Sequence, residues 1–177
     1  MTLEEIRNAK INPIIAREAH DQSAKRLSDL LEVKNTFEQK AFILFNGYIT
    51  ATLALFGVAG AIFNTHGLTS LVAALGITGI CFTIGAIFFV LALIDKTYGT
   101  LGSSPDMWLE SGKIDGPDSV LPLMLAYITF YYQERINVSR NSNAKKAIRI
   151  RTGIILGAIA PFALLATLIA YRTISCL

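Results

Sequence analysis

Long apolar runs alternate with polar segments along this chain. Three runs, 41–63, 68–94 and 152–174, are each 23 residues or longer and contain no Asp, Glu or Lys. The one Arg within them, Arg172, lies near the end of the third run. Because a helix needs about 20 apolar residues to cross the hydrocarbon core of a bilayer, each run predicts a membrane-spanning helix. The pattern therefore predicts an integral membrane protein.

The polar segments beside these runs also carry helical patterns. Apolar residues recur at steps of three and four over 120–131, which predicts an amphipathic helix, and no helix breaker separates it from the third run. Residues 14–40 carry a modest apolar stripe without sustained heptads, so we do not expect a long coiled coil. Shorter helices are expected at 105–111 and from Thr2, the latter interrupted by Pro13.

The predicted fold is an all-α membrane protein with three transmembrane helices. The first two form a hairpin, because the four residues 64–67 are long enough only for a tight turn. The expected segments are a cytoplasmic amphipathic helix (1–40), a transmembrane hairpin (41–94, with spans 41–63 and 68–94), a cytoplasmic helical segment (95–151), a third transmembrane helix (152–174) and an outer tail (175–177).

Lysine and arginine gather on one side of the predicted membrane. Residues 1–40 hold seven and 95–151 hold eight of the 16, whereas 64–67 holds none. Positive residues stay cytoplasmic, which predicts a multi-pass protein of the bacterial inner membrane with a cytoplasmic N-terminus. The net charge of +3 does not indicate nucleic-acid binding, since seven acidic residues balance the basic ones in 1–40.

The chain lacks the residue patterns of a catalytic, metal or cofactor site. His20 and His66 have no paired spacing, and Cys81 and Cys176 are expected at opposite depths of the membrane. The acidic residues of 95–118 fit helix-end electrostatics better than a hard-cation site. The spans hold no ionisable group at midplane, which argues against a transporter or pump. We therefore expect a non-enzymatic protein without a cofactor.

The predicted spans are rich in small and weakly polar residues. In lipid, small residues let helix backbones approach closely. Gly153 and Gly157 form a GxxxG motif, for which contact within the chain and contact between chains are both open. The polar residues of the spans either hydrogen-bond to backbone or line a polar surface in an oligomer; they are Asn46, Thr50, Thr52, Thr78 and Thr83. The glycines that we expect in helix packing or oligomerisation are Gly57, Gly60, Gly76, Gly79, Gly153 and Gly157.

A basic stretch precedes the third run. Residues 135–151 combine six basic residues with three Asn. One interpretation is a binding surface for an anionic ligand such as a nucleotide second messenger. The interpretation that we favour is a basic collar held by lipid phosphates. The residues concerned are Arg135, Arg140, Lys145, Lys146, Arg149 and Arg151.

The layout of the chain resembles a known family. A charged helix ending in Leu27–Ala41 (LSDLLEVKNTFEQKA) leads into two spans, and the run Asn137…Asn141…Asn143-Ala-Lys-Lys precedes another. This layout resembles the small membrane effectors of bacterial anti-phage signalling systems of the SLATT and Pycsar type. The resemblance implies assembly in the inner membrane and damage to it once a sensor fires. The third span and the short tail depart from the simplest two-span members, and no functional residue is carried over.

These observations predict an effector that oligomerises in the inner membrane and permeabilises or disrupts it, with phage defence as the setting that the resemblance implies. Its expected partners are the lipid bilayer, further copies of the chain and a cytosolic protein. One alternative is a membrane-anchored scaffold or regulatory subunit that recruits a cytosolic partner through 1–40 and 96–151. Another is a small channel component.

Overall fold

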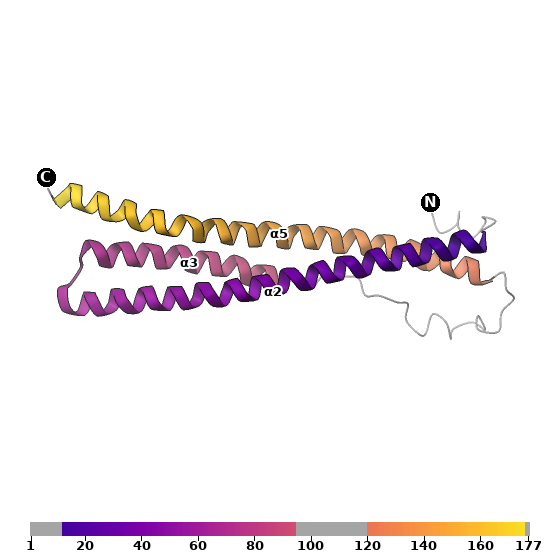
Figure 1. The fold of residues 1–177 in the computed structure, drawn as a ribbon, viewed down its shortest axis with the longest axis horizontal. Helices are drawn as coiled ribbons and strands as arrows, with labels where there is room; N and C mark the ends of the chain where they lie inside the picture. The colour runs from indigo at the N-terminus through magenta and orange to yellow at the C-terminus, as the bar shows by residue number, and fades with distance from the viewer. Residues whose placement is uncertain (1–11, 95–119, 176–177) are drawn as a thin grey trace. The chain divides into compact units, whose positions relative to one another are not determined.

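The computed structural model describes residues 12–94 and 120–175, and nearly all of them are helical. Three α-helices follow one another along the chain: α2 (Pro13–His66), α3 (Ser70–Ile94) and α5 (Val120–Ser175) (Figure 1). All three are long and apolar enough to cross a membrane. The prediction of a helical membrane protein with three candidate spans is confirmed for the part of the chain that the structure describes.

The helices extend well beyond the apolar runs. α2 is 54 residues long and contains both the polar segment 14–40 and the first apolar run, and α5 is 56 residues long and joins the basic stretch to the third. The predicted helices from Thr2 and at 105–111, as well as Cys176, lie outside the described residues.

The helix ends follow from local sequence. Asn12 precedes α2, and its side-chain Oδ1 accepts a hydrogen bond from the Ile14 amide at 2.9 Å. Pro13 is then the first residue of the helix, a position where its missing amide hydrogen costs nothing. At the other end of α2, Gly67 adopts a φ of 71° and its amide donates to the Phe63 carbonyl at 2.9 Å. A left-handed glycine of this kind ends a helix because it lacks the Cβ that would clash.

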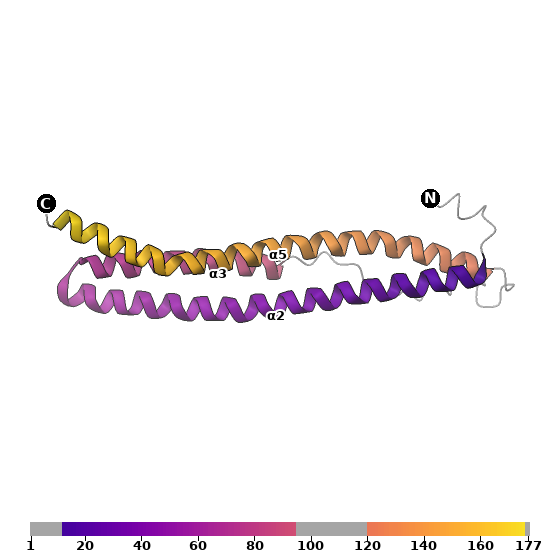
Figure 2. The same ribbon diagram turned by 45° about the horizontal axis from the view of Figure 1, so that its top comes forward.

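The chain divides into two compact units, which are described separately. The first combines residues 1–35 with 97–143. Its described parts of α2 and α5 lie side by side and run in the same direction (Figure 2). Leu27 of α2 forms the core there with Ile128, Tyr132 and Ile136 of α5.

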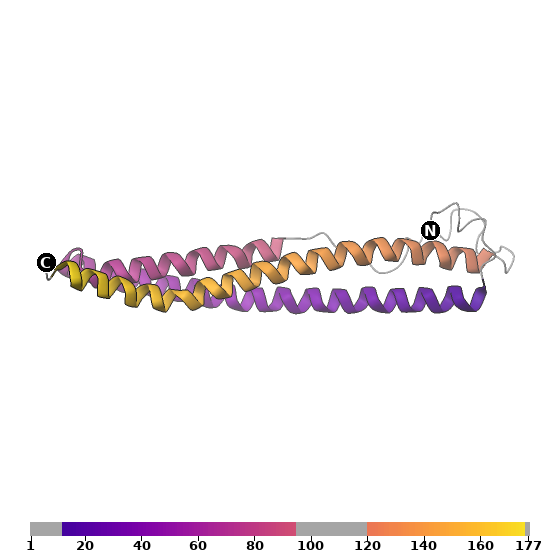
Figure 3. The same cartoon turned by 90° about the horizontal axis from the view of Figure 1, so that it is seen from above.

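The second unit combines residues 36–96 with 144–177. It contains the apolar halves of α2 and α5 together with α3, which lie side by side (Figure 3). The contacts of Tyr48 with Phe89 and of Phe56 with Gly79 show that α3 runs antiparallel to α2. Ala41, Phe89, Ala92 and Ile150 form its buried core.

Large apolar side chains point outward from the second unit. The exposed fraction is 69% for Ile43, 53% for Ile80 and 70% for Phe162, one on each helix. In water such a continuous apolar exterior would be a liability. It is the expected exterior of helices that face lipid tails, and it agrees with the length and composition of the three helices.

Candidate functional site in the helix bundle

Tyr48 lies at the centre of the second unit and contacts both other helices. Its hydroxyl donates a hydrogen bond to the Gly153 carbonyl of α5 at 3.1 Å. Its ring packs edge-on against Phe82 and Phe89 of α3, with centroids 5.0 and 4.9 Å apart. Aromatic pairs favour this T-shaped geometry, so Tyr48 links the three helices through one side chain.

Three glycines provide the space that the aromatic rings occupy. A Cβ atom on Gly85 would lie 2.6 Å from Cε1 of Tyr48, and one on Gly153 would lie 2.6 Å from Cε1 of Phe89. A Cβ on Gly157 would collide with the Tyr48 hydroxyl. Both glycines of the GxxxG motif are therefore used for packing within the chain.

The six glycines expected in helix packing divide into two groups. Gly79, Gly153 and Gly157 contact side chains of other helices in the same chain, Gly79 through the ring of Phe56. For the remaining three, no atom lies within 4 Å of the point that a Cβ would occupy, so packing among the described residues does not account for them; they are Gly57, Gly60 and Gly76.

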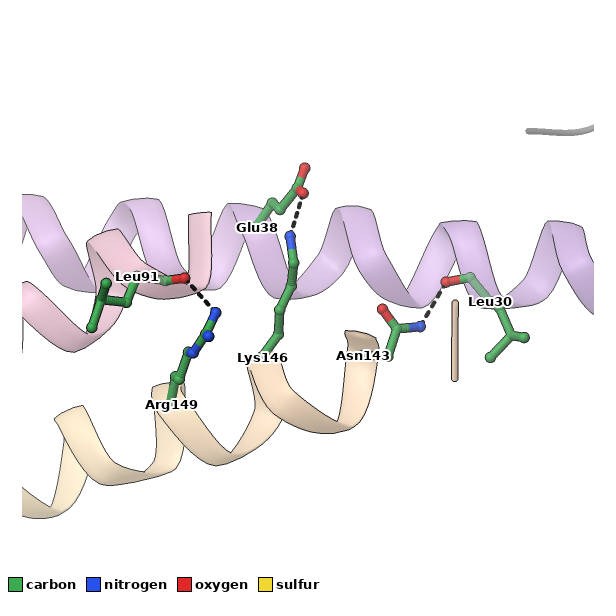
Figure 4. Close-up of polar contacts among 6 residues, drawn as sticks. All are labelled: Leu30, Glu38, Leu91, Asn143, Lys146 and Arg149. Carbon is green, nitrogen blue, oxygen red and sulfur yellow. Dashed lines mark hydrogen bonds and ion pairs between the residues drawn. The ribbon is translucent and has the colours of Figure 1, made fainter. Parts of the chain in front are cut away.

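Lys146 of the basic stretch faces inward. Its side chain is fully buried, and its Nζ lies 2.6 Å from Oε1 of Glu38, which is 31% exposed (Figure 4). A buried ammonium needs an opposite charge and hydrogen bonds to offset its loss of hydration. Lys146 is therefore a structural partner of Glu38 in this fold and does not present its charge to an anionic ligand.

Arg149 is also engaged within the second unit. Its guanidinium donates to the Leu91 carbonyl at 2.7 Å (Figure 4). Leu91 belongs to the last turn of α3, whose carbonyls have no partner inside the helix and carry partial negative charge. Arg149 therefore caps the end of α3. Of the other basic residues of the stretch, Arg135 is half-buried, whereas Arg140, Lys145 and Arg151 are exposed.

Beside its apolar core, the first unit also buries polar side chains. Ser139, Ser142 and Asn143 are all buried on α5. Asn143 donates through Nδ2 to the Leu30 carbonyl at 2.9 Å (Figure 4). The hydroxyls of Ser139 and Ser142 have no hydrogen-bond partner among the described residues. Most buried hydroxyls are hydrogen-bonded, so these two mark an unusual spot in the helix pair.

The buried positions in each unit recur at alternating steps of four and three. In the first unit they are Tyr132, Ile136, Ser139 and Asn143 on α5, facing α2. In the second unit the same spacing is found for Lys146, Ile150, Gly153, Gly157 and Ala160. All of these are buried except Gly157, which is half-buried. This is the spacing of helices that pack along a common seam. On α5 the spacing is kept although several of the buried residues are polar or charged.

An open groove of about 300 Å³ lies at the start of the helix pair in the first unit. Pro13 and Ile14 of α2 and Leu121 and Leu125 of α5 form its apolar part. Within the described residues, no three His, Cys, Asp or Glu side chains gather in a way that suits a metal ion. His20 lies beside the Tyr132 ring, and His66 contacts the Thr65 hydroxyl.

Three residues with key contacts were not predicted from the sequence: Glu38, Tyr48 and Phe89. Glu38 is one of several charged residues just before an apolar run, and nothing in its neighbours singles it out. Tyr48 and Phe89 resemble the other aromatic residues of the spans. The sequence signal for Tyr48 and Phe89 lies only in the combination of these rings with glycines of the facing helices, against which they pack here.

The chain matches no family model, no curated protein and no solved structure.

Proposed function

We propose that this chain is a multi-pass protein of the bacterial inner membrane, with its N-terminus and the 95–151 segment cytoplasmic and 41–94 inserted as a hairpin. Exposed basic residues support this orientation: Lys40, Lys145 and Arg151 lie at the end of the second unit where α2 and α5 begin their apolar parts. At the other end, the connection after α2 carries no Lys or Arg. Positive charge collects on the cytoplasmic side.

In this membrane the protein acts as a non-enzymatic effector that oligomerises and permeabilises or disrupts the bilayer. The observation that carries the proposal is that α2 turns uncharged polar residues outward inside its apolar half. Asn46 and Thr50 are exposed there, as are Gly57 and Gly60. Lipid tails cannot hydrogen-bond the Asn46 amide, whereas neighbouring copies or water in a pore can. The layout resembles effectors of anti-phage signalling, so phage defence is the setting that we propose.

Purified protein in liposomes tests this function. A potassium gradient with valinomycin sets a membrane potential, and a voltage-sensitive dye reports its loss. We expect the potential to collapse at protein-to-lipid ratios where chemical cross-linking detects oligomers. Gly157→Leu, which disrupts packing against Tyr48, is the matched control and should leave the potential intact. A stable potential in the presence of cross-linked oligomers contradicts the proposal.

The groove of the first unit favours a second candidate, a membrane-anchored scaffold that recruits a cytosolic protein. Ile14 beside this groove has an exposed fraction of 79%, and Leu121 across from it is 45% exposed. For a scaffold, one cytosolic protein should copurify in stoichiometric amount and be lost in Ile14→Asp and Leu121→Asp. Liposomes containing the chain alone should then remain tight.

A further inference from the structure

We propose that α2 binds α2 of a second copy of this chain through an outward stripe centred on Asn46. The stripe consists of Asn46, Thr50, Leu53, Gly57, Gly60 and Asn64. This inference rests on the proposed function and deepens it, because it names the helix face through which the copies meet.

The stripe has the geometry of a helix-packing seam. Its six residues follow one another at steps of four, three, four, three and four, and all six are exposed. The inner face of the same helix has the same spacing, from Phe37 through Ala41 and Leu44 to Tyr48. Residues at this spacing stay aligned along one side when two helices cross at a small left-handed angle. α2 therefore carries two seams, one of which is used inside the chain.

The side-chain amide of Asn46 is the part of the stripe that needs a hydrogen-bonding partner. It lies five residues inside the apolar run that begins at Ala41, or about 7 Å along a helix. Thr50 donates to the Asn46 backbone carbonyl at 2.9 Å, and among the described residues nothing bonds the Asn46 side chain. In hydrocarbon an amide without hydrogen bonds is costly.

The glycines add an independent argument. Glycine lowers helix stability relative to alanine and is retained where a backbone must approach something closely. Gly79, Gly85, Gly153 and Gly157 have such a reason within the chain, whereas Gly57 and Gly60 on the stripe have open space around them. α2 is also the helix that the rest of the chain buries least. In its most apolar stretch 11% is buried, against 33% in that of α3.

A second copy is the partner that fits this stripe. The Asn46 amide carries both a donor and an acceptor, so two such groups satisfy each other. Copies inserted in the same orientation place their Asn46 side chains at the same depth in the membrane. A different protein has no reason to place a matching amide at that depth. The stripe carries no charge, so identical helices do not repel one another. The glycines then let the two backbones come close beyond Asn46.

Cysteine cross-linking of the full chain in membranes tests whether two copies meet through this stripe. In a background with Cys81→Ser and Cys176→Ser, single variants Thr50→Cys and Leu53→Cys place a thiol on the stripe and keep Asn46 and the glycines. Ile80→Cys and Ile87→Cys on α3 are matched controls, because both positions are exposed at 53% and 52%. Mild oxidation should give disulfide-linked dimers at the stripe positions and at least tenfold less dimer at the α3 positions.

A second measurement addresses the amide itself. Asn46→Leu should weaken self-association of the full chain in detergent about tenfold, and Asn46→Gln should largely restore it, since an interhelical hydrogen bond of this kind contributes that much in membrane-spanning peptides. The inference is overturned if the cysteines on α3 give as much dimer as those on the stripe, or if Asn46→Leu self-associates as strongly as the natural chain. If liposomes leak while the stripe gives no dimer, the inference fails and the proposed function stands. A monomer in tight liposomes overturns both.

Discussion

Glu38 and Lys146 form an ion pair with 2.6 Å between Oε1 and Nζ, and the two residues have unequal access to water. The Lys146 side chain is fully buried, whereas that of Glu38 is 31% exposed. The pair is therefore asymmetric: removing one partner does not have the same effect as removing the other.

The first prediction follows from this asymmetry. Glu38→Ala deprives a buried ammonium of its carboxylate and should lower the free energy of unfolding by about 3 kcal/mol. Lys146→Met removes the buried charge and leaves a glutamate in contact with water, at a cost of about 1 kcal/mol. Unfolding in mixed micelles with increasing SDS, followed by circular dichroism, measures both. Equal losses for the two variants would contradict the asymmetric burial.

The second prediction concerns Gly157. Gly157→Ala places a methyl group against the Tyr48 hydroxyl, and overpacking of this kind should destabilise the bundle by about 2 kcal/mol. Gly76→Ala is the control, because nothing lies within 4 Å of its Cβ position, and it should be neutral or slightly stabilising. In a Tyr48→Ala background the cost of Gly157→Ala should largely disappear. The same SDS titration measures these changes in stability. If Gly157→Ala destabilised the Tyr48→Ala variant as much as the natural chain, the contact between Gly157 and Tyr48 would be refuted.

The Tyr48 hydroxyl supports a third prediction. Tyr48→Phe keeps the ring contacts with Phe82 and Phe89 but loses the hydrogen bond to the Gly153 carbonyl. The loss should be about 0.6 kcal/mol, as for other interhelical hydrogen bonds in membrane proteins. Tyr127→Phe serves as the control, since the described residues give its hydroxyl no hydrogen bond. A loss above about 2 kcal/mol would mean that the hydroxyl does more than bond this carbonyl.

Ser139 gives the fourth prediction, with the opposite sign. Its side chain is fully buried and its hydroxyl has no hydrogen-bond partner in the described part of the chain. Ser139→Ala should therefore raise the stability of the protein by about 1 kcal/mol. Ser28→Ala, on an exposed position of α2, should change it little. Thermal unfolding in detergent measures the difference, and a destabilised Ser139→Ala would show that the hydroxyl is engaged.

The three long helices could be predicted because span length and apolar composition are properties of single segments. Runs such as 41–63 need no knowledge of neighbours to indicate a membrane helix. Helix ends were partly predictable, since an Asn followed by Pro13 favours a start, and Gly67 favours a stop.

The interior packing could not be predicted in the same way. The buried side of α5 includes Ser139, Asn143 and Lys146, so the spacing is a heptad but the residues are polar. A search for apolar periodicity misses such a seam. Lys145 and Lys146 illustrate the limit further: adjacent residues on a helix differ by about 100° in direction, and only the path of α2 decides which of them is buried.

The GxxxG motif shows the same limit. Gly153 and Gly157 fit contact within or between chains equally well in sequence, whereas the structure places the Phe89 ring beside Gly153 and the Tyr48 side chain beside Gly157 within one chain. Glu38 and Tyr48 became recognisable as important residues only through partners more than 100 positions away, Lys146 and Gly153.

The connection at Gly67 has a consequence for how the protein is made. Between Ala41 and Ile94 the chain contains no Lys, Arg, Asp or Glu, so in the proposed topology the apolar half of α2, the turn and α3 can leave the translocation machinery together as one uncharged unit. Nothing in this stretch requires a charged group to be carried across hydrocarbon. In the same proposed topology, Arg172 is the one Lys, Arg, Asp or Glu of the third run, 152–174, that has to make that passage.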